Sequence, residues 1–87
     1  MAIIKKKIWP EYFELVSSGK KKFELRLADF DVNEEDTLLL EEWDPKTKEY
    51  TGRVLKKKVS YLLKTKDMDF WSKEDIEKYG FYVLSLE

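Results

Sequence analysis

Hydrophobic and polar positions alternate along several segments of the chain. The clearest case is residues 22–28, where Phe23, Leu25 and Leu27 fall on one side and charged residues on the other. A period of two is typical of a β-strand that has one face against a core. Patterns of this kind, with apolar runs between turn residues, predict about five strands, near residues 2–8, 22–28, 37–43, 50–63 and 81–86.

Two segments between these strands have helical features. Pro10 suits the first turn of a helix, where its missing N–H would be unpaired anyway, and Gly19 suits the end because it adopts positive φ at low cost. A shorter helix is predicted near 72–79, with Ser72 as its N-cap and Gly80 at its end. The order strand–helix–strand–strand–strand–helix–strand favours a small α+β domain, a mostly antiparallel β-barrel with one or two short helices.

The chain of 87 residues has room for a single core, so we expect one domain over residues 1–87. It contains neither cysteine nor histidine, which excludes disulfides, thiolate metal sites and histidine-based acid–base chemistry. No apolar run of about 18 residues is present, and the N-terminus lacks the apolar stretch of a signal peptide. These features predict a cytoplasmic protein without a membrane segment.

Charge is distributed unevenly, although the net charge is only −1. Residues 1–28 carry seven bases and three acids, and residues 50–66 carry six bases and no acid. Residues 29–49 carry two bases and nine acids, and residues 67–87 carry two bases and six acids. A site for an anion therefore depends on whether the two basic blocks meet in space.

Glu24 and Arg26 lie on the same face of the predicted strand at 22–28, and Lys21 stands at its start. A carboxylate between two cations stays ionised, because nearby positive charge lowers its pKa. Arg26 offers a planar fork of donors that suits a phosphate or a base edge. A solvated ladder of charges, which contributes little to stability, is the alternative interpretation.

Three lysine triplets occur, at 5–7, 20–22 and 56–58. Successive side chains of a strand point to opposite faces, so a triplet cannot form a one-sided patch. Lys6 and Lys57 share the parity of apolar neighbours and should either line a cleft or extend from a barrel mouth. Lysines that merely keep a small barrel soluble are the alternative. The residues expected to converge on one cleft for an anionic ligand are Lys6, Lys21, Arg26 and Lys57.

Aromatic residues can stack on bases where an exposed ring lies beside positive charge. Trp9 is the best candidate, because it follows the first lysine triplet at the junction of a predicted strand and helix. Trp43 lies in an acidic block and is less suitable. The acidic stretch at 29–36 lacks the spacing of a calcium loop, so we interpret it as a solvated loop and expect no metal.

The pattern G-x-K-x-x-E-x-R occurs at residues 19–26. The stretches Glu42-Trp43-Asp44-Pro45, Tyr50-Thr51-Gly52-Arg53 and Gly80-Phe81-Tyr82-Val83-Leu84 follow it in order. Together these motifs resemble the ASCH-like domains of unknown function in the PUA-like superfamily, over nearly the whole chain. This family usually has Val-Gly-Asp before its third strand, where this chain has Glu34-Glu35-Asp36. Loss of that glycine should stiffen the turn or place another residue in the left-handed conformation.

The resemblance implies a module that binds RNA or a modified base. A few small ASCH proteins are amidohydrolases that deacetylate N4-acetylcytidine with a lysine, a threonine and a glutamate. Lys21 matches that lysine, but Glu24 occupies the position of the threonine, and only Glu74 and Glu77 lie in roughly the region of the glutamate.

The first prediction is therefore a nucleic-acid or nucleotide-binding module whose partner is RNA, a nucleotide or a modified nucleoside, with no cofactor. A small amidohydrolase that uses Lys21 and Glu24 is one alternative, and a protein-interaction module is the other. The predicted ligand-binding residues are Lys6, Trp9, Lys21, Glu24, Arg26 and Lys57.

Overall fold

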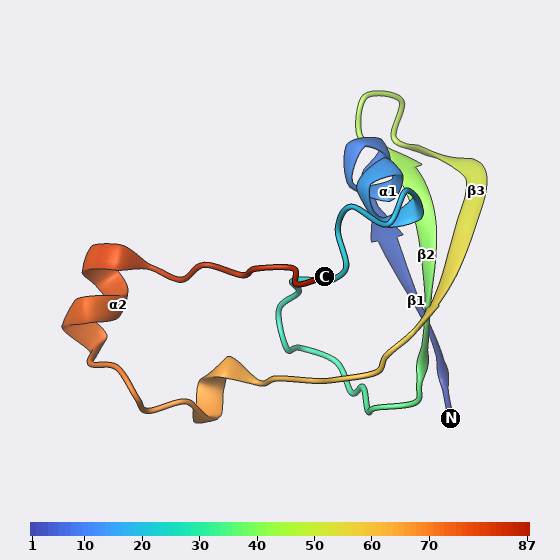
Figure 1. The fold of residues 1–87 in the computed structure, drawn as a ribbon. Helices are drawn as coiled ribbons and strands as arrows, with labels where there is room; N and C mark the ends of the chain where they lie inside the picture. Colours follow the sequence, from blue (N-terminus) through green and yellow to red (C-terminus); the bar gives the residue numbers. More distant parts are fainter.

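The computed structural model describes residues 1–87 except for the side chain of Asp67. It forms a small α+β fold in which a three-stranded sheet carries one helix and a long arm extends to one side (Figure 1). No helix among the described residues has the length and apolar character needed to cross a membrane. The elements are β1 (Ile3–Ile8), α1 (Pro10–Ser17), β2 (Thr37–Asp44), β3 (Glu49–Lys58), the short 3₁₀ helix η1 (Thr65–Asp67) and α2 (Lys73–Tyr79).

The sheet has the order β1-β2-β3, with β2 in the centre. β1 pairs with β2 in parallel, and β3 pairs with β2 in the antiparallel direction. A parallel pair needs a crossover connection, which α1 and residues 18–36 supply. In this register Lys6 lies opposite Leu40, and Leu40 lies opposite Leu55. These three side chains therefore share one face of the sheet.

The core lies between α1 and this face of the sheet. Pro10 stands in the first turn of α1, as predicted, and Gly19 follows the helix with φ of 82°. This arrangement turns the apolar side of α1 toward the even-numbered residues of β2. The buried apolar residues are Ile8, Phe13, Val16, Leu38 and Leu40, with Ile4, Leu55 and Val59 packed against them.

Residues 22–28 form no strand in the structure and pair with no neighbouring strand. Leu25 and Leu27, expected in the core, are 70 % and 82 % exposed. Glu24 and Arg26 are the more sheltered residues. Alternation defines two faces of a strand but does not provide the surface that covers one of them. Here the charged side of the segment has found partners, whereas Leu25 and Leu27 of the apolar side have not.

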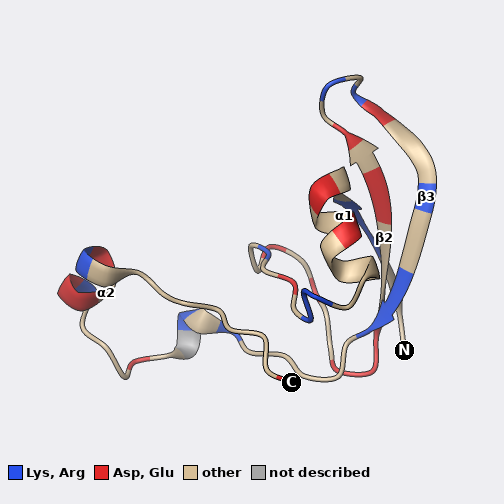
Figure 2. Ribbon diagram, turned by 45° about the horizontal axis from the view of Figure 1, so that its top comes forward, with Lys and Arg blue, Asp and Glu red and all other residues tan. Residues whose placement is uncertain are grey.

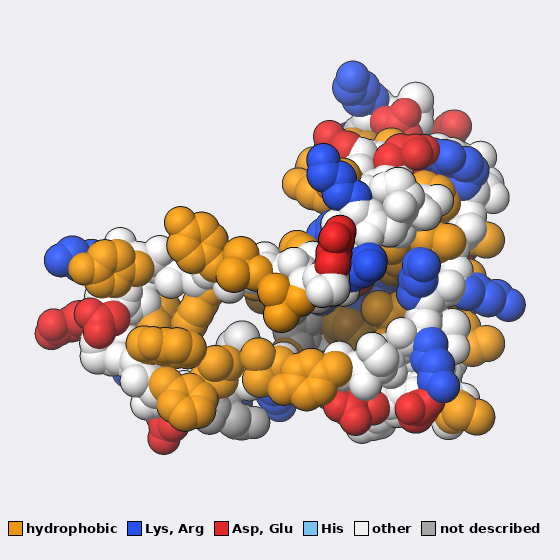
Figure 3. Space-filling model, in the orientation of Figure 1, with side chains coloured by type: hydrophobic (Ala, Val, Ile, Leu, Met, Phe, Trp, Pro, Cys, Tyr) orange, Lys and Arg blue, Asp and Glu red, His pale blue; other side chains and the backbone are white. Residues whose placement is uncertain are grey.

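The C-terminal part of the chain also departs from the prediction. β3 ends at Lys58, and the predicted last strand at 81–86 forms no ladder, so residues 60–87 make up an extended arm. None of the described residues of this arm is buried, and hydrophobic side chains are exposed along it (Figure 3). The sheet is therefore mixed and three-stranded, where a mostly antiparallel barrel of about five strands was expected.

One prediction about a turn and one about a helix cap are confirmed. Glu35, in the turn where the resemblance implied either a stiffer turn or a left-handed residue, has φ of 79°. Asp36 stabilises this turn, because its carboxylate accepts hydrogen bonds from the backbone N–H of Ala2 at 2.8 Å and of Asn33 at 2.9 Å. These two bonds lower the pKa of Asp36. At α2, the Ser72 hydroxyl accepts from the backbone N–H of Asp75 at 3.1 Å, as expected of an N-cap.

Candidate functional site

Glu24 lies between two cations, as its sequence position predicted. Its Oε1 is 3.4 Å from Lys21 Nζ, and its Oε2 accepts a hydrogen bond from Arg26 Nε at 2.9 Å. The exposed fractions of these side chains are 17 % for Glu24, 18 % for Lys21 and 28 % for Arg26. The group is therefore partly sheltered from water, which makes its charge interactions stronger than those of a fully solvated ladder.

Arg26 also links this group to β1. Its Nη2 donates to the backbone carbonyl of Lys7 at 2.6 Å. Next to Lys7 in β1, Lys6 points to the other face of the strand, where its Nζ lies 3.6 Å from the centre of the Phe30 ring. A cavity of about 230 Å³ opens at this place, lined by Lys6, Arg26, Leu27, Asp29 and Phe30. Two cations from segments far apart in sequence thus face one hollow.

The structure brings together four of the six predicted ligand-binding residues. Lys21, Glu24 and Arg26 form one chain of contacts, and Arg26 lines the cavity together with Lys6. Lys57 is not part of this group. It is exposed on β3, and the central strand β2 separates β3 from β1, which carries Lys6. The basic residues of β3 lie on an outer strand of the sheet, with β2 between them and β1 (Figure 2).

Trp9 does not line the cavity either. It is the N-cap residue of α1 and is 48 % exposed. The ring beside the cationic pair is Phe30, which the sequence analysis had placed in a solvated acidic loop. The sequence signal for Phe30 was its position as a single aromatic residue between Asp29 and Asp31. An apolar ring in a charged loop needs a partner. That partner is the ammonium group of Lys6, placed over the ring.

A second polar cluster lies between β2 and β3, and the sequence analysis missed it. Glu42 is 3 % exposed and accepts from Thr51 Oγ1 at 2.5 Å and from Arg53 Nε and Nη2 at 2.9 and 2.7 Å. A β-bulge creates this cluster, because the register shifts between Glu41 and Trp43. The shift lets Thr51 and Arg53 reach the same carboxylate. The signal in the sequence was the parity of Glu42 with the buried leucines of β2.

Arg53 connects this cluster to α1. Its Nη2 also donates to Glu14 Oε1 at 2.6 Å, and its guanidinium lies 4.6 Å from the centre of the Phe13 ring. Hydrogen bonds from Arg53 and Thr51 lower the pKa of Glu42, and bonds to Glu42 and Glu14 raise the pKa of Arg53. Both carboxylate oxygens of Glu42 accept hydrogen bonds from side chains of the same chain. This cluster therefore holds the helix against the sheet and does not face a ligand.

The structure brings together some of the residues considered for the amidohydrolase alternative and separates others. Lys21 and Glu24, the two residues named for this alternative, are in contact. α2, which carries Glu74 and Glu77, lies at the far end of the arm (Figure 1). The described residues also contain no group of three or more acidic, histidine or cysteine side chains that could hold a metal ion. The geometry near Lys21 offers cations and an orienting carboxylate, which suits the binding of an anion.

Comparison with known protein families places this geometry in context. Residues 3–85 match the model of a family described as a domain of unknown function, DUF3850. The chain belongs to this family. No curated protein and no solved structure matches it. For this DUF3850 domain, the family therefore gives no activity, and the functional argument rests on the cavity and its side chains.

Proposed function

We propose that this DUF3850 domain binds a phosphate-bearing nucleotide unit, either free or in an RNA strand, at the cavity between Lys6 and Arg26. The observation that carries the proposal is that these two cations, from β1 and from the segment after α1, line one hollow beside an aromatic ring. Cations from separate segments are what a localised anion requires, whereas solubilising lysines need no common cavity.

Glu24 has an orienting role in this proposal. It holds Arg26 through Nε, and the Lys7 carbonyl holds the same guanidinium through Nη2. Among the hydrogen bonds of the described residues, Nη1 is not used, so it is available to a phosphate oxygen. A guanidinium fixed in advance loses less conformational freedom when it binds, which strengthens each hydrogen bond to the ligand.

Phe30 and Asp29 suit the remainder of a nucleotide. Phe30 can stack with a base or contact a sugar, and the Asp29 carboxylate can accept a hydrogen bond from an amino or hydroxyl group. The cavity of about 230 Å³ lies below the range of roughly 300–1,000 Å³ typical of sites that enclose a whole small molecule. It therefore suits one nucleotide unit at a time, not a duplex.

Titration followed by NMR of the ¹⁵N-labelled protein tests the proposal. We expect a nucleoside monophosphate to shift the Arg26 Nε–H signal and the amides of Lys6 and Phe30. The matching nucleoside without phosphate should shift them far less. A short RNA strand should act at the same residues, and its affinity should fall as salt rises, because phosphate binding releases counterions.

Three variants locate the site. Lys6→Ala and Arg26→Lys should each weaken nucleotide binding by about 10-fold, the effect of losing one good charged contact. Lys57→Ala removes an equally basic, exposed residue of β3 and should change the affinity by less than about 2-fold. Absence of shifts with every nucleotide and with RNA would refute the proposal. An equal loss in Lys57→Ala would show that binding follows overall charge and not this cavity.

A further inference from the structure

The arm, residues 60–87, leaves the molecule with far more surface than a compact protein of its size. The accessible surface is 7,675 Å², whereas a folded monomer of 10.5 kDa should expose about 5,400 Å². The radius of gyration is 14.8 Å, against about 12 Å for a compact chain of this length. The chain therefore exposes roughly 2,200 Å² more than a compact monomer, and none of the described residues of the arm is buried.

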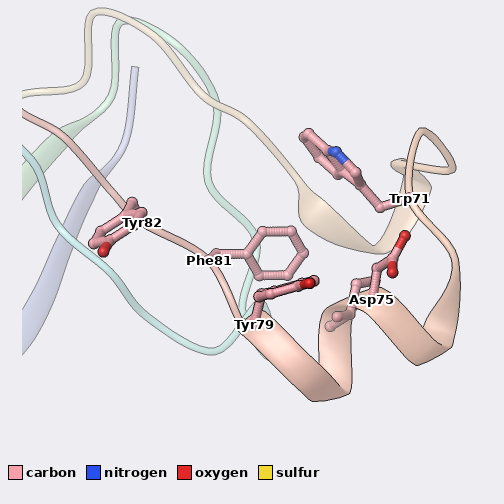
Figure 4. Close-up of a pocket in the computed structure, with 7 residues that line it drawn as sticks. Trp71, Asp75, Tyr79, Phe81 and Tyr82 are labelled. Atoms are coloured by element: carbon pink, nitrogen blue, oxygen red, sulfur yellow. The ribbon is translucent and has the colours of Figure 1, made fainter.

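The part of the arm that includes α2 carries a concentrated aromatic surface. Trp71 is 50 % exposed, Phe81 53 %, and their rings meet edge to face at 5.8 Å. Together with Tyr79 and Tyr82 they surround a hollow of about 290 Å³ beside α2 (Figure 4). Apolar patches of this kind on a soluble protein mark an interaction surface. We define the arm surface as Phe70, Trp71, Tyr79, Phe81 and Tyr82.

Among the described residues, no other part of the same chain covers this surface. The arm is tied at both ends, because Val59 exchanges backbone hydrogen bonds with Glu35 and Asp36, and the Ser85 hydroxyl accepts from the Lys22 N–H. α2 lies between these ties, away from the sheet (Figure 1). One face of the sheet is already covered by α1. The register places the following lysines on its other face: Lys5, Lys7, Lys56 and Lys58.

We propose that the arm surface packs against the same surface of a second copy of this chain. A two-fold contact of this type is self-complementary, since each copy presents the same apolar patch. Stable interfaces bury about 1,200–2,000 Å² in total. Two chains together expose an excess well above that area, and interfaces of this kind are enriched in tryptophan, tyrosine and phenylalanine.

Charge around the arm surface gives the association a recognisable salt dependence. Glu74, Asp75 and Glu77 belong to α2, and residues 67–87 carry six acids and two bases. Two such acidic rims repel each other across a two-fold contact. Salt screens this repulsion, so dimerisation should strengthen as salt rises. Nucleotide binding at the Lys6–Arg26 cavity should weaken under the same change, which separates this inference from the proposed function.

Sedimentation velocity over a concentration series tests the inference. The wild-type chain should shift from monomer to dimer as its concentration rises, with a lower dissociation constant at higher salt. Trp71→Arg and Phe81→Ser should each raise that constant at least about 10-fold, as expected of central aromatic contacts. Tyr50→Ser alters a ring of similar exposure, 53 %, on β3, and should leave the constant within about 2-fold.

Circular dichroism should show that each variant retains the wild-type fold, because all three positions are exposed. A wild-type monomer at every concentration, with the small radius of a compact domain, would overturn the inference by showing that the arm closes on its own sheet. A monomer with an expanded radius would overturn it as well, since the arm would then have no partner. Equal weakening by Tyr50→Ser would place the interface elsewhere.

Discussion

The sheet with α1 and the arm differ in how they use similar residues. Both contain alternating apolar and polar positions and several aromatic rings. In the first region, β2 pairs with a strand on each side, and Leu38 and Leu40 are buried beneath α1. In the arm, Val83 and Leu84 are 47 % and 71 % exposed. An alternating segment thus buries its apolar residues only where neighbouring strands and a covering element exist.

The two regions also differ in their polar contacts. Among the described residues, every salt bridge lies within residues 1–59, and the Glu42–Arg53 pair joins both long strands to α1 through Glu14. α2 has a good N-cap but no buried residue. A helix of seven residues without packing is of marginal stability. Local hydrogen bonds can therefore define an element, whereas packing makes it stable.

Substitution of one leucine in each region should give the largest contrast. Leu40 is fully buried, and Leu84 is 71 % exposed. Leu40→Ala should lower the free energy of unfolding by about 2–5 kcal/mol, because it removes buried contacts and leaves a cavity. Leu84→Ala should change it by less than about 0.5 kcal/mol. Urea denaturation measures both, and equal losses would contradict the division into a packed region and an unpacked arm.

Removal of the Glu42 charge should have an intermediate effect that depends on pH. Glu42→Gln should lower the melting temperature at pH 7 by roughly 4–8 °C, because Arg53 loses its charged acceptor. The pKa of Glu42 in the folded chain is below its ordinary value of 4.5. Its contribution is therefore complete above that pH and is lost as pH falls through the lowered pKa.

Thermal unfolding between pH 7 and pH 3 checks this prediction. The wild-type melting temperature should fall more steeply below pH 4.5 than that of Glu42→Gln. A slope should remain in the variant, because Asp36 also has a lowered pKa. Glu41→Gln, on the opposite face of β2, is the matched control and should retain the wild-type profile. Parallel profiles for wild type and Glu42→Gln would show that Glu42 is not responsible.

The smallest global effect should come from the cap of α2. Ser72→Ala removes the acceptor of the Asp75 N–H, which typically costs about 1 kcal/mol of helix stability. Because α2 is not packed, this loss should appear as faster amide exchange in residues 73–79, with the urea midpoint unchanged. A lower midpoint would mean that α2 takes part in cooperative unfolding.

Local features of the fold were predictable from the sequence. Pro10, Gly19, Ser72 and Gly80 mark the ends of the helices. A left-handed residue such as Glu35 was one of the two outcomes that the resemblance implied for its turn. These features depend on residues within a few positions of one another. The pairing of Glu24 with its two cations was predictable for the same reason, since all three residues lie within one short segment.

Contacts between distant segments needed the tertiary structure. Lys6 and Lys57 have the same parity relative to their apolar neighbours, yet only Lys6 meets Arg26, because β2 separates the outer strands. Phe30 lines the cavity because of the path that its loop follows in the folded chain. The bulge that brings Glu42 and Arg53 together depends on the pairing of β2 with β3.

By itself the sequence determined where most elements begin and end and which face of each strand is apolar. These properties follow from backbone preferences and side-chain spacing, which act over a few residues. The tertiary structure alone decided which faces are covered, which cations share a cavity and how much aromatic surface the arm exposes. Those outcomes depend on which distant segments pair, and the free energy of that pairing belongs to no single segment.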